Sequence, residues 1–242
     1  MVEKTKTAKN GIVEELMSVG AHFGYASARR HPSTKNYILG SKNKVEIFNL
    51  EKTAEKLAEA EKAMETLGSE GKTILFVTSK GEARSVIRSA AESIEMPFVA
   101  GRWIGGTITN FEQIRKRVQK LIDLTDQKEK GQLGKYTKKE RLMIDREIEK
   151  LTEMFEGIVP MSKTPDALFV IDSKQEDIAV TEAIQKHIPV FALSSSDCDL
   201  SMVDHPVPAN DSAQKSIEFI TKKLIEAYQE GKKKVPVKKA SK

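Results

Sequence analysis

Residues 102–111 read Arg-Trp-Ile-Gly-Gly-Thr-Ile-Thr-Asn-Phe, and this stretch divides the chain into two kinds of sequence. Before it, short apolar runs are bounded by Gly and Pro. After it come long charged segments with helical periodicity. Adjacent glycines permit tight turns and close backbone approaches, and asparagine favours the N-cap of a helix. We therefore predict a structural junction here, formed by Trp103, Gly105, Gly106 and Asn110.

On both sides of residues 111–155 the chain alternates between short apolar runs and helical patterns. The apolar runs cover residues 73–77, 97–100, 167–171 and 188–193. The helical patterns cover residues 50–68, 81–94, 176–186 and 213–228. Continuous apolar runs are typical of strands buried on both faces, and strands that alternate with helices pair in parallel through right-handed crossovers. We predict an α/β fold with an open, doubly wound, mostly parallel sheet of about five strands and helices on both faces.

The N-terminal part of the chain follows a different pattern. A short amphipathic helix is predicted over residues 11–19 and ends at Gly20. Two strand patterns, residues 37–40 and 45–49, flank the polar sequence Ser-Lys-Asn-Lys at 41–44. This arrangement predicts a β-hairpin with a basic tip.

Residues 111–155 carry two narrow apolar stripes. Their members recur every three or four residues, at Phe111, Ile114, Val118 and Leu121 and again at Ile144, Ile148, Leu151 and Phe155. This spacing predicts an inserted arm, an antiparallel two-helix coiled coil. Gly131 to Gly134 supply its turn, and Thr137 with Glu140 forms a capping box for the second helix. The charged outer face of the arm is either solvated or a contact surface for nucleic acid or protein.

We therefore expect four parts in this chain of 242 residues, a length that suits one substantial domain with an appendage. They are a flexible basic N-terminus at residues 1–10, an α/β domain at residues 11–110 and 156–230, a coiled-coil hairpin insertion at residues 111–155, and a disordered Lys-rich tail at residues 231–242.

Positive charge is gathered into patches. The net charge is +5, but residues 1–10 contribute +2 and residues 231–242 contribute +6, so the region between them is acidic. Within that region, residues 29–44 hold five Lys or Arg and no acid, and residues 102–120 hold five against one Glu. Concentrated patches favour a polyanion such as nucleic acid, whereas a Lys-rich tail alone is equally typical of a disordered, solubilising segment.

The loops after the predicted strands hold no known catalytic set. The phosphate-binding patterns G-x-G-x-x-G after a strand and G-x-x-x-x-G-K-[ST] are missing from the sequence. Asp197, Cys198, Asp199 and His205 could ligate a metal, but loop carboxylates usually cap helices and a single cysteine is usually a small buried hydrophobe. We expect no catalytic residue, metal or cofactor. The alternative is an α/β nucleotide- or phosphate-binding enzyme that uses the loops at Lys80, Arg102, Lys174 and residues 194–199.

The compartment follows from three observations. A single cysteine excludes an intramolecular disulfide, which fits a reducing compartment. No apolar run approaches the roughly 20 residues of a membrane-spanning helix, and the first residues lack the apolar core of a signal peptide. We expect a soluble, cytoplasmic protein with no membrane partner and no small-molecule substrate.

Four stretches, in their order and spacing, resemble the small-subunit ribosomal protein two family (S-two) in its bacterial form. They are Gly20-Ala-His-Phe-Gly24, Asn43-Lys44 through Ile47 to Asn49-Leu-Glu-Lys-Thr53, Arg102-Trp-Ile-Gly-Gly106 through Thr109-Asn110, and Pro165-Asp-Ala-Leu-Phe-Val-Ile-Asp172 through Glu182 to Ile188-Pro-Val190. The predicted helical hairpin falls between the third and the fourth. The resemblance covers about residues 11–228.

This resemblance implies a structural, rRNA-binding protein of the small ribosomal subunit, with a flavodoxin-like sheet and a projecting coiled coil. It implies no catalysis and no cofactor. The implied partners are small-subunit rRNA and neighbouring small-subunit proteins, including the large mRNA-binding protein S-one. Trp103 either stacks on an unpaired base or packs in the core, and its neighbours Ile104 and Ile108 favour the core. The rRNA-binding candidates are Arg29, Arg30, Lys35, Lys42, Lys44, Arg102, Arg115 and Arg117.

The chain departs from the family pattern in the loops at residues 25–32 and 195–200 and also at residues 209–213. Tyr25 stands where the family has a second His, and Arg30 and His31 stand where it commonly has Trp and Asn. The sequence of residues 195–200 also differs from the usual Asp-Thr-Asn-Cys-Asp-Pro. These changes alter local contacts, but Arg29 and Arg30 keep the first loop cationic.

Overall fold

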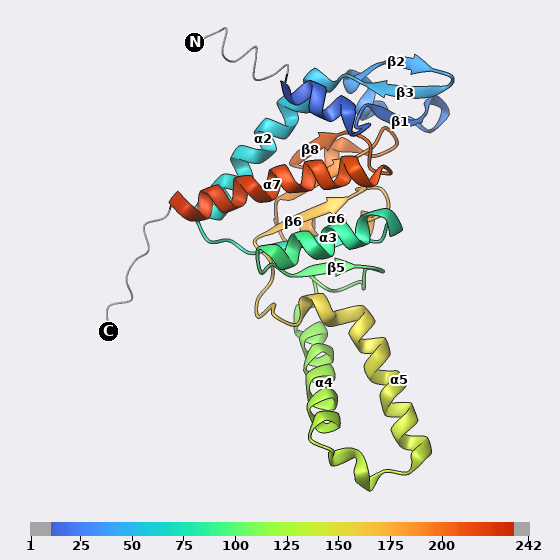
Figure 1. The fold of residues 1–242 in the computed structure, drawn as a ribbon, viewed down its shortest axis with the longest axis vertical. Coiled ribbons are helices and arrows are strands. Elements are labelled where there is room, and N and C mark those ends of the chain that lie inside the picture. The colour runs from blue at the N-terminus through green and yellow to red at the C-terminus, as the bar shows by residue number, and fades with distance from the viewer. Residues whose placement is uncertain (1–10, 235–242) are drawn as a thin grey trace.

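The computed structural model describes residues 11–234, which form an α/β body and a two-helix arm that projects from one end of it (Figure 1). The predictions for residues 1–10 and 235–242 lie outside the described residues. None of the helices within residues 11–234 is long and apolar enough to cross a membrane.

The central sheet has five parallel strands. In chain order they are β4 (Ile74–Thr78), β5 (Phe98–Ala100), β6 (Ala167–Ile171), β7 (Val190–Ser194) and β8 (His205–Pro208). They lie side by side in the order β5-β4-β6-β7-β8, and the predicted α/β class is confirmed. This is the order of flavodoxin-like folds, in which the chain reverses its direction of travel across the sheet between the first and third strands. Here that switch point lies between β4 and β6.

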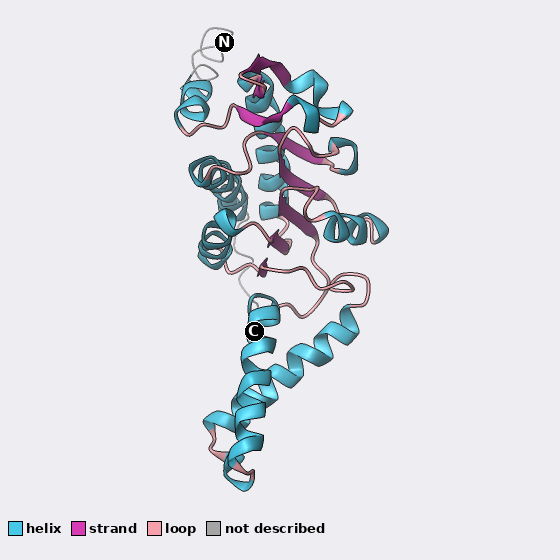
Figure 2. Cartoon of the chain, turned by 90° about the vertical axis from the view of Figure 1, so that its right-hand side faces the viewer, coloured by secondary structure: helices cyan, strands magenta, loops and turns pink. Residues whose placement is uncertain are grey.

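Helices cover both faces of this sheet, which Figure 2 shows edge-on. Alternate residues of a strand point to opposite faces, so Ile74 and Phe76 of β4 enter one apolar core while Leu75 and Val77 enter the other. The first core is closed by α2 (Leu50–Ser69), α3 (Gly81–Ser93) and α7 (Gln214–Lys234). The second core is closed by α6 (Asp177–Gln185) and by the base of the arm.

β8 is the strand that the apolar runs do not predict. Its sequence, His-Pro-Val-Pro, contains two residues that cannot donate to a strand ladder, and prolines are therefore largely confined to edge strands. β8 is such an edge strand and pairs only with β7 among the described residues. On its open side the carbonyl of Pro208 accepts a hydrogen bond of 2.7 Å from the Thr53 hydroxyl of α2. The edge position makes both prolines tolerable.

The two longest helices of the body, α2 and α7, cross at a pair of glycines. A Cβ on Gly68 of α2 would overlap the carbonyl oxygen of Tyr228 in α7. A Cβ on Gly231 of α7 would likewise overlap the carbonyl oxygen of Glu65 in α2. The backbones approach more closely than any residue with a side chain allows.

Two predicted helix boundaries differ from the structure. The second helix is predicted over residues 50–68 and continues one residue further, because Gly68 is a packing residue inside α2, which ends at Ser69. Gly71, with φ of +64°, follows that end. The last helix runs beyond the predicted domain boundary at residue 230 as far as Lys234, so residues 231–234 of the predicted tail are helical.

A second, antiparallel sheet lies at the end of the body away from the arm (Figure 1). Residues 11–18 are helical and end near Gly20, as predicted. The following elements are β1 (Phe23–Ala26), η1 (Ser27–Arg29), η2 (Pro32–Tyr37), β2 (Ile38–Lys42) and β3 (Val45–Phe48), with the strand order β1-β3-β2. β2 and β3 form the predicted hairpin. Asn43 and Lys44 at its tip both have positive φ, as a two-residue hairpin turn requires.

The arm consists of α4 (Phe111–Glu129), η3 (Gln132–Lys135) and α5 (Lys138–Phe155), followed by η4 (Glu156–Ile158). The capping box of Thr137 and Glu140 is present, and Gly131 adopts φ of +66° in the turn. At the base, Ile114, Val118 and Leu121 of α4 and Leu151 and Phe155 of α5 are buried and join the second core of the body.

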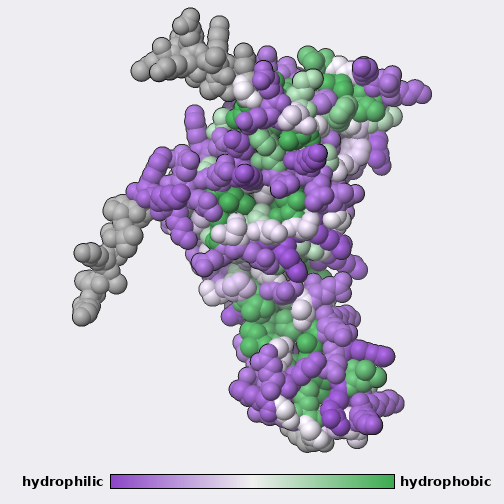
Figure 3. Space-filling view, in the orientation of Figure 1, coloured by the Kyte–Doolittle hydropathy of each residue, from purple (hydrophilic) through white to green (hydrophobic). Residues whose placement is uncertain are grey.

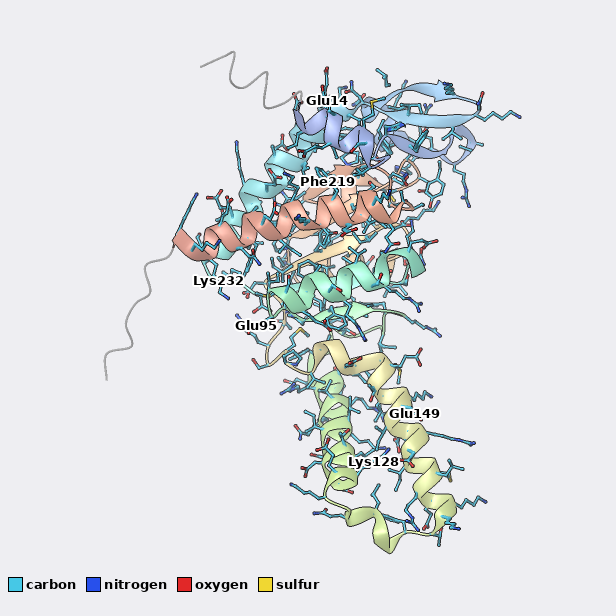
Figure 4. The ribbon with its side chains drawn as sticks, in the orientation of Figure 1. Glu14, Glu95, Lys128, Glu149, Phe219 and Lys232 are labelled. Atoms are coloured by element: carbon cyan, nitrogen blue, oxygen red, sulfur yellow. The ribbon has the colours of Figure 1, made fainter. Side chains whose placement is uncertain are left out.

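Farther along α5, Ile144 and Ile148 are only half-buried, whereas Leu133 in the turn at the tip is buried. Figure 3 shows apolar residues along the middle of the arm, between hydrophilic flanks. Ion pairs also join the two helices: Lys128 of α4 lies on the side that faces α5 (Figure 4) and is 2.8 Å from Asp145. The helical hairpin is therefore observed, while coiled-coil packing along its whole length stays a prediction.

Candidate nucleic-acid interface and arm junction

Three of the predicted rRNA-binding residues lie around the β2–β3 hairpin. Lys35 is on η2, Lys42 is the last residue of β2, and Lys44 is in the turn of the hairpin. All three are exposed, and none makes an ion pair with another residue in the range 11–234. Their charges are available to an external anion.

The two arginines before this hairpin differ from each other. Arg29 is exposed, and its guanidinium lies 5.3 Å from the centre of the Tyr25 ring. Arg30 instead donates to Glu46 Oε1 at 3.1 Å, and Glu46 is only 1% exposed. Because a buried carboxylate needs a counter-ion, Arg30 has a structural role and its charge is largely compensated.

The other three candidates lie at the arm. Arg102 is exposed just after β5, and Arg117 is exposed on α4. Arg115 donates to the carbonyl oxygens of Val159 and Met161, at 3.0 and 3.1 Å, and so ties α4 to the segment that follows η4. Arg117 borders a groove of about 790 Å³ between the arm helices, together with the cationic residues Lys116, Lys120 and Lys150. The cations thus form two groups at opposite ends of the body, not one patch.

The predicted junction is organised by a residue outside it, Glu182 of α6. Its Oε1 accepts hydrogen bonds from the Trp103 ring nitrogen at 3.1 Å and from the Gly106 N–H at 2.7 Å. Its Oε2 accepts from the N–H groups of Ile108 at 3.0 Å and Thr109 at 2.9 Å, and from the Thr109 hydroxyl at 3.0 Å. Burial raises the pKa of this carboxyl, but the donors outweigh burial and the net pKa is lowered.

The four predicted junction residues have different roles. Trp103 is 8% exposed and packs in the second core, so the core interpretation of this tryptophan is confirmed. Gly106 has φ of +91°, a conformation that favours glycine, whereas Gly105 is exposed and has no contact that requires a glycine. Asn110 stands at the N-cap position of α4 but makes no capping hydrogen bond. The predicted N-cap position is confirmed, but the side chain does not cap, and the φ and ψ of −123° and 46° are not those of an extended cap residue.

Sequence reasoning missed the function of Glu182. A signal was present, since this glutamate interrupts an apolar helix face that includes Ala179, Val180 and Ala183. A carboxylate at such a position is buried only when donors satisfy it. Sequence alone cannot say which donors do so.

The switch point between β4 and β6, where open α/β sheets bind ligands, is filled by the protein's own side chains. Lys80 Nζ lies 2.8 Å from Asp172 Oδ2 and 2.7 Å from Asp211 Oδ2. Burial lowers the pKa of Lys80, but the two carboxylates outweigh it and raise the net pKa. Burial raises the pKa of Asp211 to about 6 despite the adjacent ammonium. Tyr25, a departure from the family pattern, bonds here through its hydroxyl to Lys80 at 3.3 Å and to Ser212 at 2.9 Å.

The candidate metal ligands Asp197, Cys198, Asp199 and His205 do not form one cluster within residues 11–234. His205 stacks on Phe191 with the rings 4.4 Å apart, and Asp199 accepts hydrogen bonds from Ser201. A different set, Asp172, Cys198 and Asp211, places its ligand atoms within 4.8 Å of one another. However, the ammonium of Lys80 already pairs with both of these carboxylates, so the cluster has its own cation.

Cys198 is fully buried beside Asp172, with Sγ 3.3 Å from Oδ1, and burial raises the pKa of its thiol to about 12. Only the thiolate is nucleophilic. We therefore expect iodoacetamide at pH 8 to leave the native protein unmodified and to label it once in urea, as read by intact-protein mass spectrometry. Labelling of the native protein at the rate of an exposed thiol would contradict this.

The comparisons with known proteins agree with one another. The profile of the family described as Ribosomal protein S2 matches residues 16–231, which include both the body and the arm. The small ribosomal subunit protein uS2 of Coprothermobacter proteolyticus is 40% identical over 220 residues, which are 91% of this chain and 82% of the relative. That of Helicobacter acinonychis is 40% identical, with 91% and 89% covered, and that of Sulfurimonas denitrificans is 41% identical, with 91% and 85% covered. The chain therefore belongs to the ribosomal protein S2 family.

Proposed function

We propose that this protein is a structural constituent of the small ribosomal subunit, where it binds small-subunit rRNA and neighbouring proteins and supports translation in the cytoplasm. The observation that carries the proposal is the family match over residues 16–231, which is continuous through the arm and the body. The protein acts as a scaffold and not as an enzyme.

The enzyme alternative has no support in the comparisons, and the geometry of the switch point also speaks against it. An enzyme with this sheet would bind its ligand at the carboxyl ends of β4 and β6. In this protein that place holds Lys80, Asp172 and Asp211, each at most 9% exposed. A nucleotide would have to displace paired, buried charges.

The two groups of cations suit a ribosomal position between separate RNA segments. Lys35, Lys42 and Lys44 lie at one end of the body, and Arg102 and Arg117 lie at the arm. Lys and Arg bind phosphates without reading sequence, so they position a protein on RNA. We infer that both ends contact rRNA, and that the arm and the body also contact neighbouring proteins, among them protein S-one.

Sedimentation of a cell lysate tests the proposal. We expect the protein to run with small subunits, and a protein that stays at the top of the gradient would refute the proposed function. A variant in which a short Gly-Ser linker replaces residues 122–150 separates the two groups of contacts, because it keeps the buried residues at the base of the arm. If the arm contributes, this variant leaves the small-subunit fraction at a lower salt concentration than the full chain does.

The hairpin cations give a quantitative prediction. Each phosphate that a protein neutralises contributes about 0.9 to the slope of log affinity against log salt on duplexes and about 0.7 on single strands. The variant Lys35→Ala/Lys42→Ala/Lys44→Ala should therefore bind depleted small subunits with a slope that is smaller by about 2 to 3. The matched control is Lys215→Ala/Lys222→Ala/Lys233→Ala, which removes three exposed lysines from α7. If the two variants had equal slopes of log affinity against log salt, the hairpin cations would not be part of the rRNA interface.

A further inference from the structure

The junction between body and arm is built around one carboxylate. Glu182 accepts five hydrogen bonds, all from residues 103–109, and two of them come from the side chains of Trp103 and Thr109. These partners lie 73 to 79 positions away in the sequence. A helix of the body thus holds the loop that leads into the arm.

The arrangement requires an ionised acceptor. The N–H groups of Gly106, Ile108 and Thr109 converge on one side chain that is 6% exposed. Hydrogen bonds to a charged acceptor are roughly twice as strong as neutral ones, and a buried N–H without an acceptor is costly. The positive φ of Gly106 belongs to the same turn, so its N–H points at Oε1.

The loop held by Glu182 continues directly into α4, which begins at Phe111. The segment that returns from the arm to the body, η4 and the residues after it, is held by other contacts. Gly157 packs so closely on the backbone of Phe98 in β5 that a Cβ there would overlap its carbonyl oxygen, and Arg115 of α4 bonds the carbonyls of Val159 and Met161, which joins the two ends of the arm. Both connections of the arm are therefore fixed to the body, and Glu182 fixes the outgoing one to α6.

We propose that Glu182 is a positioning residue that sets the direction in which the arm leaves the body, so that the arm meets its ribosomal partners in one orientation. The part concerning the ribosome rests on the proposed function, whereas the part concerning the arm's direction does not. Without the carboxylate, the loop of residues 103–109 loses its common acceptor, and the arm samples several orientations. Partners that bind one orientation then see only a fraction of the molecules, and the apparent affinity falls by that fraction.

A distance measurement tests the first part. Spin labels are placed on Cys introduced at Ser89 of α3 and at Glu129 near the arm tip, both exposed, in the full-length protein. The buried native Cys198 stays unlabelled. The wild-type protein should give one narrow distribution of label-to-label distances by pulsed electron paramagnetic resonance. Glu182→Gln, which turns a donor toward the N–H groups, should broaden or split this distribution.

The matched control is Glu176→Gln. Glu176 adjoins the same helix, is 2% exposed and accepts from the Ser79 N–H at 2.6 Å, but has no bond to the arm junction. It should keep the narrow distribution. If Glu182→Gln does not fold, Glu182→Asp keeps the charge, shortens the reach and should broaden the distribution less. A narrow, unchanged distribution in a folded Glu182 variant overturns the proposal.

Binding to depleted small subunits tests the second part. If about a tenth of the Glu182→Gln molecules hold the competent orientation, affinity falls about tenfold, while Glu176→Gln binds like the wild type. A broadened distribution with unchanged affinity would overturn the link between arm direction and ribosome binding. If the wild type itself fails to bind, the proposed function fails, and the distance measurement still decides the role of Glu182.

Discussion

Replacing Lys80 with methionine is expected to lower the free energy of unfolding by about 3 to 5 kcal/mol, the usual effect of removing one partner from a buried ion pair. Methionine fills a similar volume, so the loss comes from charge and not from a cavity. The two carboxylates of Asp172 and Asp211 would face each other without a cation, and Asp211 is fully buried. Urea unfolding followed by circular dichroism measures the change.

Two further variants make this result interpretable. Lys222→Met removes an exposed lysine whose ion pair with Glu226 is 4.0 Å long, and it should change stability by less than about 1 kcal/mol. Lys80→Met/Asp211→Asn removes one of the two stranded charges and should recover part of the loss. If Lys80→Met were as stable as the wild type, the cluster at the switch point would contribute nothing to folding.

Gly68→Ala is expected to destabilise the protein by about 3 kcal/mol, at the upper end of overpacking effects. Alanine favours a helix over glycine by about 1 kcal/mol, so helix propensity alone predicts stabilisation. The added Cβ, however, would overlap the carbonyl oxygen of Tyr228, and a backbone atom cannot rotate away as a side chain does. The helices α2 and α7 must move apart, which loosens the first core. The midpoint of urea unfolding shows whether the substitution lowers or raises the stability.

The control for this prediction is Gly81→Ala. Gly81 begins α3 and does not have a positive φ, and a Cβ at this position would have no neighbouring atom within 4 Å. Alanine there should be neutral or stabilise by up to about 1 kcal/mol, by restricting the unfolded chain. If both alanine variants were stabilised, the close approach of α2 and α7 would not be a constraint on the fold.

Elements with a strong local pattern were predictable from sequence. Residues 167–171 form β6 as predicted, because five consecutive apolar residues suit a strand buried on both faces. The arm helices follow their apolar stripes, and the capping box at Thr137 marks the start of α5. β8 escaped prediction because two prolines argue against a strand unless it lies at an edge. Whether a strand lies at an edge is a property of the whole sheet.

The candidate site was predictable in composition but not in arrangement. The exposed hairpin cations Lys35, Lys42 and Lys44 lie where the sequence indicates. Arg30 and Arg115 look the same in sequence, yet one pairs with a buried glutamate and the other holds two carbonyls. The charge pattern of a sequence locates the cations, but it does not show which of them form ion pairs or hydrogen bonds within the fold.

The stretch at residues 102–111 shows where this division lies. By itself the sequence determined that the chain changes there from an α/β body to a helical arm, because the periods of strands and helices are local properties. Only the tertiary structure decided what holds that junction. Glu182 reaches it from more than 70 residues away, and a buried carboxylate selects its donors by position in space. The donors and the acceptor become neighbours only after the sheet has brought α6 beside the start of the arm.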